Sequence, residues 1–126
     1  MDERTAEILK RFRESWTATE DFIDHLLCIP DFERLKPVRQ FMNELKQDGG
    51  ENFFRLGTSI HMLVISRSVN QGLRKDQKWI RIEAFDSDFE VIFRDGDNIY
   101  RKYIVTDLRD IRVTKLLQTL KSTLVD

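Results

Sequence analysis

The spacing of apolar residues changes twice along this chain of 126 residues, and that change constrains its fold more than any other feature. Up to residue 48 the apolar residues recur three, four and seven positions apart, which is typical of amphipathic helices. From residue 52 to residue 105 they form short strand-like runs, which alternate with polar residues from residue 79 onward, and from residue 108 to residue 124 the helical period returns. Strands in succession, with helices only before and after them, predict an α+β domain with an antiparallel sheet.

The first part, residues 1–48, is predicted to form a helical hairpin. Its first helix runs from about residue 5 to residue 28 and ends before Pro30, because proline lacks the backbone N–H and disfavours helical geometry in the residue before it. Pro37 can occupy the first turn of a second helix, and residues 48–50 end it with Asp-Gly-Gly. Since few residues join the two helices, we expect them to be antiparallel and to bury their apolar stripes on a common partner.

The sheet is predicted to follow as an antiparallel meander. Residues 54–65 form one long kinked strand or two short ones, with Gly57 at a bend or bulge, and their apolar character on both sides favours a central strand covered on both faces. Three further strands are expected at residues 79–85, 89–94 and 99–105, joined by tight turns. The predicted order is therefore α-α-β-β-β-β-α, a four-stranded antiparallel meander with the helices packed on one face.

Length and composition fit a single domain that covers residues 1–126. Hydrophobic residues make up 40% of the chain and charged residues 34%, which indicates a folded core under a well-solvated surface. The predicted core contains seven large apolar residues from the helices and strands: Trp16, Phe22, Phe41, Ile82, Val91, Leu117 and Leu120.

The sequence has no feature of secretion or of a membrane anchor. Cys28 is the only cysteine, so the chain cannot form an intramolecular disulfide. Its polar start predicts no signal peptide, and its apolar runs are far shorter than the roughly 20 residues of a membrane-spanning helix. We therefore expect a soluble cytoplasmic protein without a membrane partner.

Motifs for cofactors and metals are also missing. The sequence contains no glycine-rich phosphate loop and no nucleophile elbow, so we expect no cofactor. His25 and Cys28 are three residues apart on a predicted helix, but a zinc site needs about three or four ligands and the chain offers too few, so we expect no metal site. The net charge of −1 makes a nucleic-acid binder less favoured, because such proteins usually carry clustered Lys and Arg.

An enzymatic alternative rests on three residues of the predicted sheet. His61 lies in an apolar strand, and Glu83 and Arg81 lie in another predicted strand. A glutamate could take the proton of an RNA 2′-hydroxyl, a histidine could protonate the leaving group, and an arginine could stabilise the charge on phosphorus. The alternative function is thus a small RNA-binding or RNA-cleaving domain that uses the sheet face. The simpler interpretation is that His61 is a hydrogen-bonded residue of the sheet with no catalytic role.

A basic and aromatic cluster is the stronger functional signal. It comprises Arg74, Lys75, Lys78, Trp79 and Arg81. Trp and Arg are enriched at the hot spots of protein interfaces, and the same residue types can grip phosphates and stack a base. Glu90 and Arg94 on the next strand would form a polar rim, and a solvated sheet edge capped by Trp79 is the structural alternative.

These observations favour a non-enzymatic intracellular domain that binds another protein and acts by occluding or scaffolding it. Small α+β domains of balanced charge include immunity proteins and other antagonists of toxins or effectors, as well as regulatory factors. The expected partner is a protein, nucleic acid is the alternative, and the sequence leaves a homodimer open.

Overall fold

Three α-helices, two short 3₁₀ helices and five strands make up the computed structural model, which describes residues 2–69 and 77–123. The fold class is α+β, as the sequence predicts. In chain order the elements are α1 (Glu3–Leu27), η1 (Pro30–Leu35), α2 (Lys36–Gln47), η2 (Gly50–Asn52), β1 (Arg55–Ser59), β2 (Met62–Ser66), β3 (Lys78–Ala84), β4 (Phe89–Asp95), β5 (Asn98–Val105) and α3 (Ile111–Lys121).

Local signals set the ends of the two N-terminal helices. Asp2 caps α1, because its carboxylate accepts a hydrogen bond from the Thr5 backbone N–H at 2.7 Å, and Pro30 lies just beyond the end of the helix. Pro37 lies in the first turn of α2, and Gly49 turns the chain after it with a φ of 86°, which glycine adopts without strain. Among the described residues no helix has both the length and the apolar character to cross a membrane.

The sheet has five strands instead of the predicted four. Their order is β1-β2-β3-β4-β5, and all neighbours are antiparallel. The stretch left open as one or two strands forms two, β1 and β2, joined by a turn at Ile60 and His61. Ile60 adopts a φ of 59°, which is rare for a β-branched residue. Because the turn contains neither the glycine nor the asparagine that usually marks a two-residue hairpin turn, the sequence does not signal it. Gly57 lies inside β1, opposite Val64, and not at a bend.

The prediction that this stretch is covered on both faces is wrong as well. β2 lies second from the edge of the sheet, and its two sides have different environments. Leu63 and Ile65 are buried in the core, whereas Met62 and Val64 on the opposite side are only partly buried. Apolar residues on both sides of a strand therefore do not require two covering layers here.

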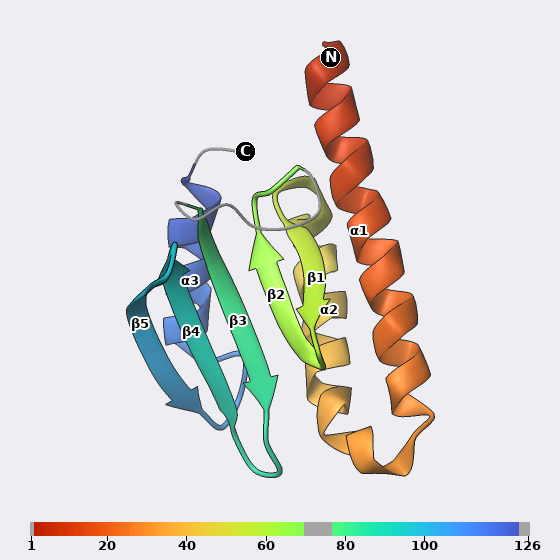
Figure 1. The fold of residues 1–126 in the computed structure, drawn as a ribbon, viewed down its shortest axis with the longest axis vertical. Helices are drawn as coiled ribbons and strands as arrows, with labels where there is room; N and C mark the ends of the chain where they lie inside the picture. The colour runs from red at the N-terminus through yellow and green to blue at the C-terminus, as the bar shows by residue number, and fades with distance from the viewer. Residues whose placement is uncertain (1, 70–76, 124–126) are drawn as a thin grey trace.

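The helices form one layer and one flank (Figure 1). α2 and α3 lie on one face of the sheet, and α1 runs beside β1. Alternate strand residues pack against these helices and form the core with them. Five of the seven predicted core residues are buried; Leu117 lies at the margin of the core and is partly buried, and Phe22 is 37% exposed, so the prediction for Phe22 is wrong.

Two side chains of α1 attach it to β1. Trp16 Nε1 donates to the carbonyl of Phe54 at 2.9 Å, and the backbone N–H of Leu56 donates to Ser15 Oγ at 3.1 Å. Backbone groups at the edge of a sheet are otherwise left without partners from a neighbouring strand. α1 therefore satisfies the upstream part of the outer edge of β1.

Candidate functional site

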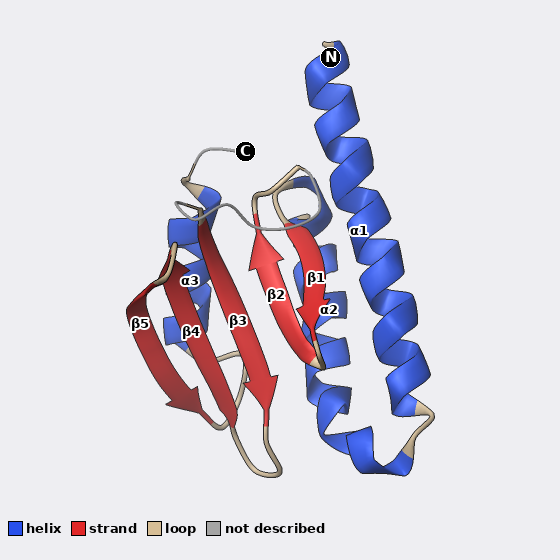
Figure 2. Cartoon of the chain, in the orientation of Figure 1, coloured by secondary structure: helices blue, strands red, loops and turns tan. Residues whose placement is uncertain are grey.

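One face of the sheet carries no helix in the described part of the chain (Figure 2). Residues paired across antiparallel strands point to the same face, so the register gives the rows of side chains there. One row is Arg55, Ser66, Trp79 and Arg94. The next row is Gly57, Val64, Arg81, Ile92 and Lys102. We call these two rows, with Glu83 and Glu90 beyond them, the open face.

Trp79 is a surface residue of this face and is only half-buried. The guanidinium carbon of Arg94 lies 5.6 Å from the centroid of the Trp79 ring, in the range of a cation–π contact. Arg94 Nη1 also donates to the carbonyl of Asp97 at 3.3 Å, which holds the arginine in place. The open face thus presents a large aromatic ring and a cation on a rigid strand pair.

Arg81 and Glu90 form the second contact of the face. Arg81 Nη2 lies 3.0 Å from Glu90 Oε1, and Lys102 Nζ lies 3.4 Å from Glu90 Oε2. Their side chains flank Ile92, which is only 3% exposed although no helix covers it. Long polar side chains can bury apolar surface with their stems, which accounts for this buried residue on an uncovered face.

The structure brings four of the seven predicted binding residues together. Trp79, Arg81, Glu90 and Arg94 all lie on the open face. Lys78 is exposed at the start of β3, but it has the same strand parity as Ile80 and so belongs to the opposite side. Arg74 and Lys75 lie outside the described residues. Among the described residues, the cluster therefore lies on the β3 and β4 strands.

The alternative catalytic pair is also close in space. His61 Nε2 lies 3.9 Å from Glu83 Oε2, and the ring of Phe32 lies 6.0 Å from that of His61. His61 belongs to the β1–β2 turn and is partly exposed, so it is not a core residue. Arg81, the third member, directs its guanidinium to Glu90. Two of the three proposed residues meet at one end of the open face, and the third pairs elsewhere.

A groove that the sequence did not predict lies between α1 and β1, and its lining includes open-face residues such as Gly57 and Trp79. Its volume is about 620 Å³, within the roughly 300–1,000 Å³ typical of ligand sites. Ala18 and Phe22 of α1 form one wall, and Trp79 lines the opposite side. The remaining lining residues are small or belong to β1 and β2: Ser15, Thr19, Arg55, Leu56, Gly57, Thr58, Ser59, Val64 and Ser66. Consecutive residues of β1 all line it, so the groove follows the outer edge of that strand.

Two features of this groove explain why it was missed. Phe22 continues the apolar stripe of α1. The helical period shows that such residues share one side of the helix, but it does not show which of them face a groove and which face the core. Gly57 sits within a regular strand, and a Cβ added there would meet no atom within 4 Å. A glycine inside a strand is a signal for close approach of another backbone, and that signal was interpreted as a bulge.

Arg55 is the charged residue of the groove. Burial lowers the pKa of Arg55 from its ordinary value of 12.5, and the positive charge of Arg11 lowers it further. Its Nη1 donates to the carbonyl of Val69 at 3.0 Å, and none of the described carboxylates lies within ion-pair distance. Burial and the neighbouring cation both penalise this charge, so a carboxylate that reached the groove would stabilise it.

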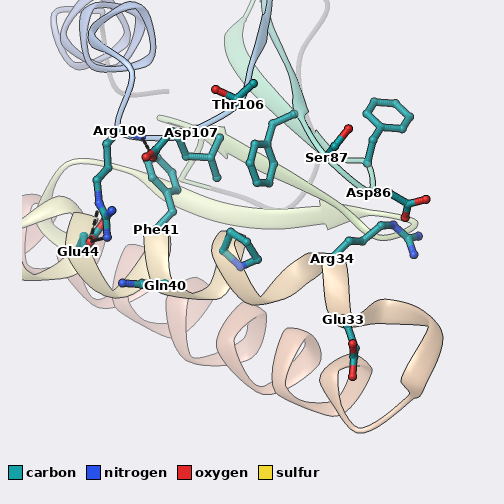
Figure 3. Close-up of a pocket in the computed structure, with 14 residues that line it drawn as sticks. Glu33, Arg34, Gln40, Phe41, Glu44, Asp86, Ser87, Thr106, Asp107 and Arg109 are labelled. Carbon is teal, nitrogen blue, oxygen red and sulfur yellow. Dashed lines mark hydrogen bonds and ion pairs between the residues drawn. The ribbon is translucent and has the colours of Figure 1, made fainter.

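A second hollow, of about 590 Å³, lies between α2 and the β3–β4 turn (Figure 3). Its two arginines are held by the protein itself. Arg34 Nε donates to the carbonyl of Ala84 at 3.2 Å, and Arg109 Nη2 lies 2.8 Å from Glu44 Oε1. These contacts join η1 and α2 to the sheet and to the segment before α3. Arg109 is thus neutralised by a carboxylate of the protein itself, whereas Arg55 and Arg94 donate to backbone carbonyls.

The free edge of β5 is a third surface with exposed apolar residues. Ile99, Tyr100 and Ile104 are each about half exposed. The strand register shifts beside Tyr100, between Phe93 and Arg94 of the paired strand, which marks an irregularity in the ladder. Irregularities and charged residues such as Arg101 on an edge strand hinder pairing with another chain. This edge is a poorer binding surface than the open face.

The open face has four cations and two carboxylates, with Trp79 among them. The described residues contain no group of three or more His, Cys, Asp or Glu placed to hold a metal ion. Comparison with protein-family models, with curated proteins and with solved structures gave no match for this chain.

Proposed function

We propose that this chain is a non-enzymatic intracellular protein-binding domain whose open face docks on an acidic region of another protein, which it occludes or scaffolds. The observation that carries the proposal is the row formed by Arg55, Trp79 and Arg94 across the uncovered face. Regulatory antagonists of the immunity type act in this way, by covering a functional surface of their target.

The energetics of interfaces support this use of the row. Hot spots are rich in Trp and Arg, and they lie where a rigid aromatic side chain is surrounded by contacts that exclude water. Trp79 is already positioned by Arg94, so its ordering costs little on binding. Arg94 has no carboxylate partner among the described residues and can pair with an incoming one in a bidentate geometry. The face is thus arranged in advance for an acidic partner.

A pull-down from the source cells tests the proposal, with tagged wild type beside Trp79→Ala and Arg94→Glu. We expect the wild type to capture a protein that survives nuclease treatment, and both variants to lose it. Lys115→Glu is the matched control, because Lys115 is an exposed cation on α3, away from the open face, and its reversal should leave capture intact. Capture that depends on Lys115 but not on Arg94 would refute an open-face interface.

RNA is the second candidate partner, and the proximity of His61 and Glu83 favours it. The same tryptophan and arginines could stack a base and contact phosphates, and the histidine–glutamate pair would then be a candidate acid and base. Binding of a mixed-sequence RNA oligonucleotide as a function of salt separates the candidates. Phosphate contacts make the logarithm of affinity fall steeply with the logarithm of salt concentration, and RNA cleavage that is lost in His61→Ala would establish the enzymatic alternative.

A further inference from the structure

The groove between α1 and β1 has an open backbone edge as well as side chains. The N–H of Leu56 points toward α1, since it donates to Ser15 Oγ. Strand backbones repeat every two residues, so the N–H and C=O of Thr58 point the same way, away from β2. The turn at Ile60 and His61 agrees with this parity, because it makes Ser59 and Met62 the hydrogen-bonded closing pair. Thr58 thus offers one donor and one acceptor to the groove.

The dimensions of the groove suit an extended chain. Ser15 and Phe22 of α1 are seven residues apart, which spans about 10 Å at 1.5 Å per residue. Three steps of an extended strand cover about the same length at roughly 3.3 Å per residue. The side chains along this length are small at Ala18 and Gly57, and Gly57 leaves open space above the strand. A backbone can therefore approach β1 closely here.

We infer that the groove binds an extended, acidic segment of the partner protein, which adds to the outer edge of β1 at Thr58 and directs a carboxylate toward Arg55. This inference rests on the proposed function and specifies how part of the partner is held. An apolar side chain of the segment packs between Phe22 and Trp79, which line the same groove. Strand addition of this kind derives affinity from main-chain hydrogen bonds and specificity from alternate side chains.

The sharpest variant is Gly57→Leu, which fills the groove from its floor. Because a Cβ at Gly57 meets nothing within 4 Å and the residue is in a regular strand, this variant should fold as well as the wild type. Gly57→Ala is the matched control, since it adds a single carbon and leaves most of the space. Thermal unfolding of both variants checks that the fold is kept.

A phage-displayed library of random short peptides serves as the probe, with the full-length wild type and Gly57→Leu as parallel baits. We expect the wild type to enrich peptides that contain acidic and β-branched residues, and Gly57→Leu to bind synthetic versions of them more than about tenfold more weakly. Gly57→Ala should bind them within about threefold of the wild type, which corresponds to about 0.6 kcal/mol. Peptides that are N-methylated at one backbone position at a time should lose affinity at alternate positions only, because only every second amide faces β1.

Several outcomes would overturn the inference. These are equal enrichment on the two baits, no enrichment on the wild type, selected peptides without acidic residues, or full tolerance of N-methylation. The pull-down separates this failure from failure of the proposed function. If Arg94→Glu loses the cellular partner and Gly57→Leu keeps it, the partner binds the open face at Arg94 and does not use the groove. If Gly57→Leu alone loses it, the partner binds in the groove and does not need Arg94.

Discussion

The two faces of the sheet are built from alternate residues of the same strands and have opposite characters. On β3, Ile80 and Ile82 point to the helices and are at most 1% exposed, while Trp79 and Arg81 point to the open face and are partly exposed. The middle of the covered face is apolar, with Lys78 and Arg101 toward its margins, and the open face combines an aromatic ring with charges. The covered face thus supplies the sheet's part of the core, and the open face partly exposes polar side chains.

Ile92 does not follow this contrast between the two faces. It is as buried as many core residues, yet it lies on the open face between Arg81 and Lys102. Ile92 is not part of the core cluster, and its register neighbours are the charged Arg81 and Lys102, whereas Ile82 belongs to the packed core. If the two faces are packed differently, Ile92 and Ile82 should contribute unequally to the free energy of unfolding although both are buried.

The largest expected effect tests this point directly. Ile82→Ala should lower the free energy of unfolding by about 2–5 kcal/mol, because a packed core relaxes only partly around a cavity. Ile92→Ala should cost clearly less, about 1–2 kcal/mol, because the long side chains around it can close over the gap. Urea denaturation of both variants measures the difference. Equal losses would show that the open face is packed as rigidly as the core.

The next effect concerns binding instead of stability. Replacing Trp79 and Arg81 together by alanine should weaken partner binding by more than about 2 kcal/mol while the free energy of unfolding changes by clearly less. Titration calorimetry with the captured partner, beside urea denaturation of the free protein, gives both quantities. Strong destabilisation with unchanged affinity would make Trp79 a structural residue and place the active surface elsewhere.

The element pattern could be predicted because each signal was local. Proline and glycine mark the ends of the N-terminal helices, and the period of two marks β3 and β4 so clearly that the buried side of β3 is assigned correctly. Trp79 and Arg94 could be assigned to one surface for the same reason. Both predictions need only the spacing of residues along the chain.

The errors arose where the outcome depends on distant parts of the chain. The β1–β2 turn has an isoleucine in a left-handed conformation, which tertiary structure imposes and local propensity opposes. Phe22 is exposed because α1 passes the edge of the sheet there, which the helical period does not record. The groove is a product of how α1 is attached through Ser15 and Trp16, so no single segment of the sequence encodes it.

A smaller effect is expected in the helices next to the covered face, where charges are paired. Arg39 of α2 donates to Asp24 at 2.7 Å and lies 3.3 Å from Glu20, both on α1. Arg39→Ala should destabilise the fold by about 1 kcal/mol, and less at high salt, since partly exposed ion pairs contribute little. Double-mutant cycles with Asp24→Ala, measured by urea denaturation at two salt concentrations, isolate the pair. No coupling at low salt would show that the Arg39–Asp24 pair does not help to join α1 to α2.

The smallest effect is the response of α3, which covers the sheet, to acid. Hydrogen bonds from the Arg112 guanidinium and backbone N–H lower the pKa of Asp110 from 3.8 to about 2, and Asp110 is the N-cap of α3. A carboxyl whose pKa is depressed in the folded state stabilises the fold above its unfolded pKa, and that contribution is lost as the pH falls from about 4 to about 2. Asp110→Asn keeps a capping side chain but cannot ionise, so it is the matched variant. Its melting temperature should lie below that of the wild type at pH 7, and the gap should close as the pH approaches 2. A difference in melting temperature that persists unchanged at pH 2 would mean that the carboxylate charge of Asp110 does not stabilise α3.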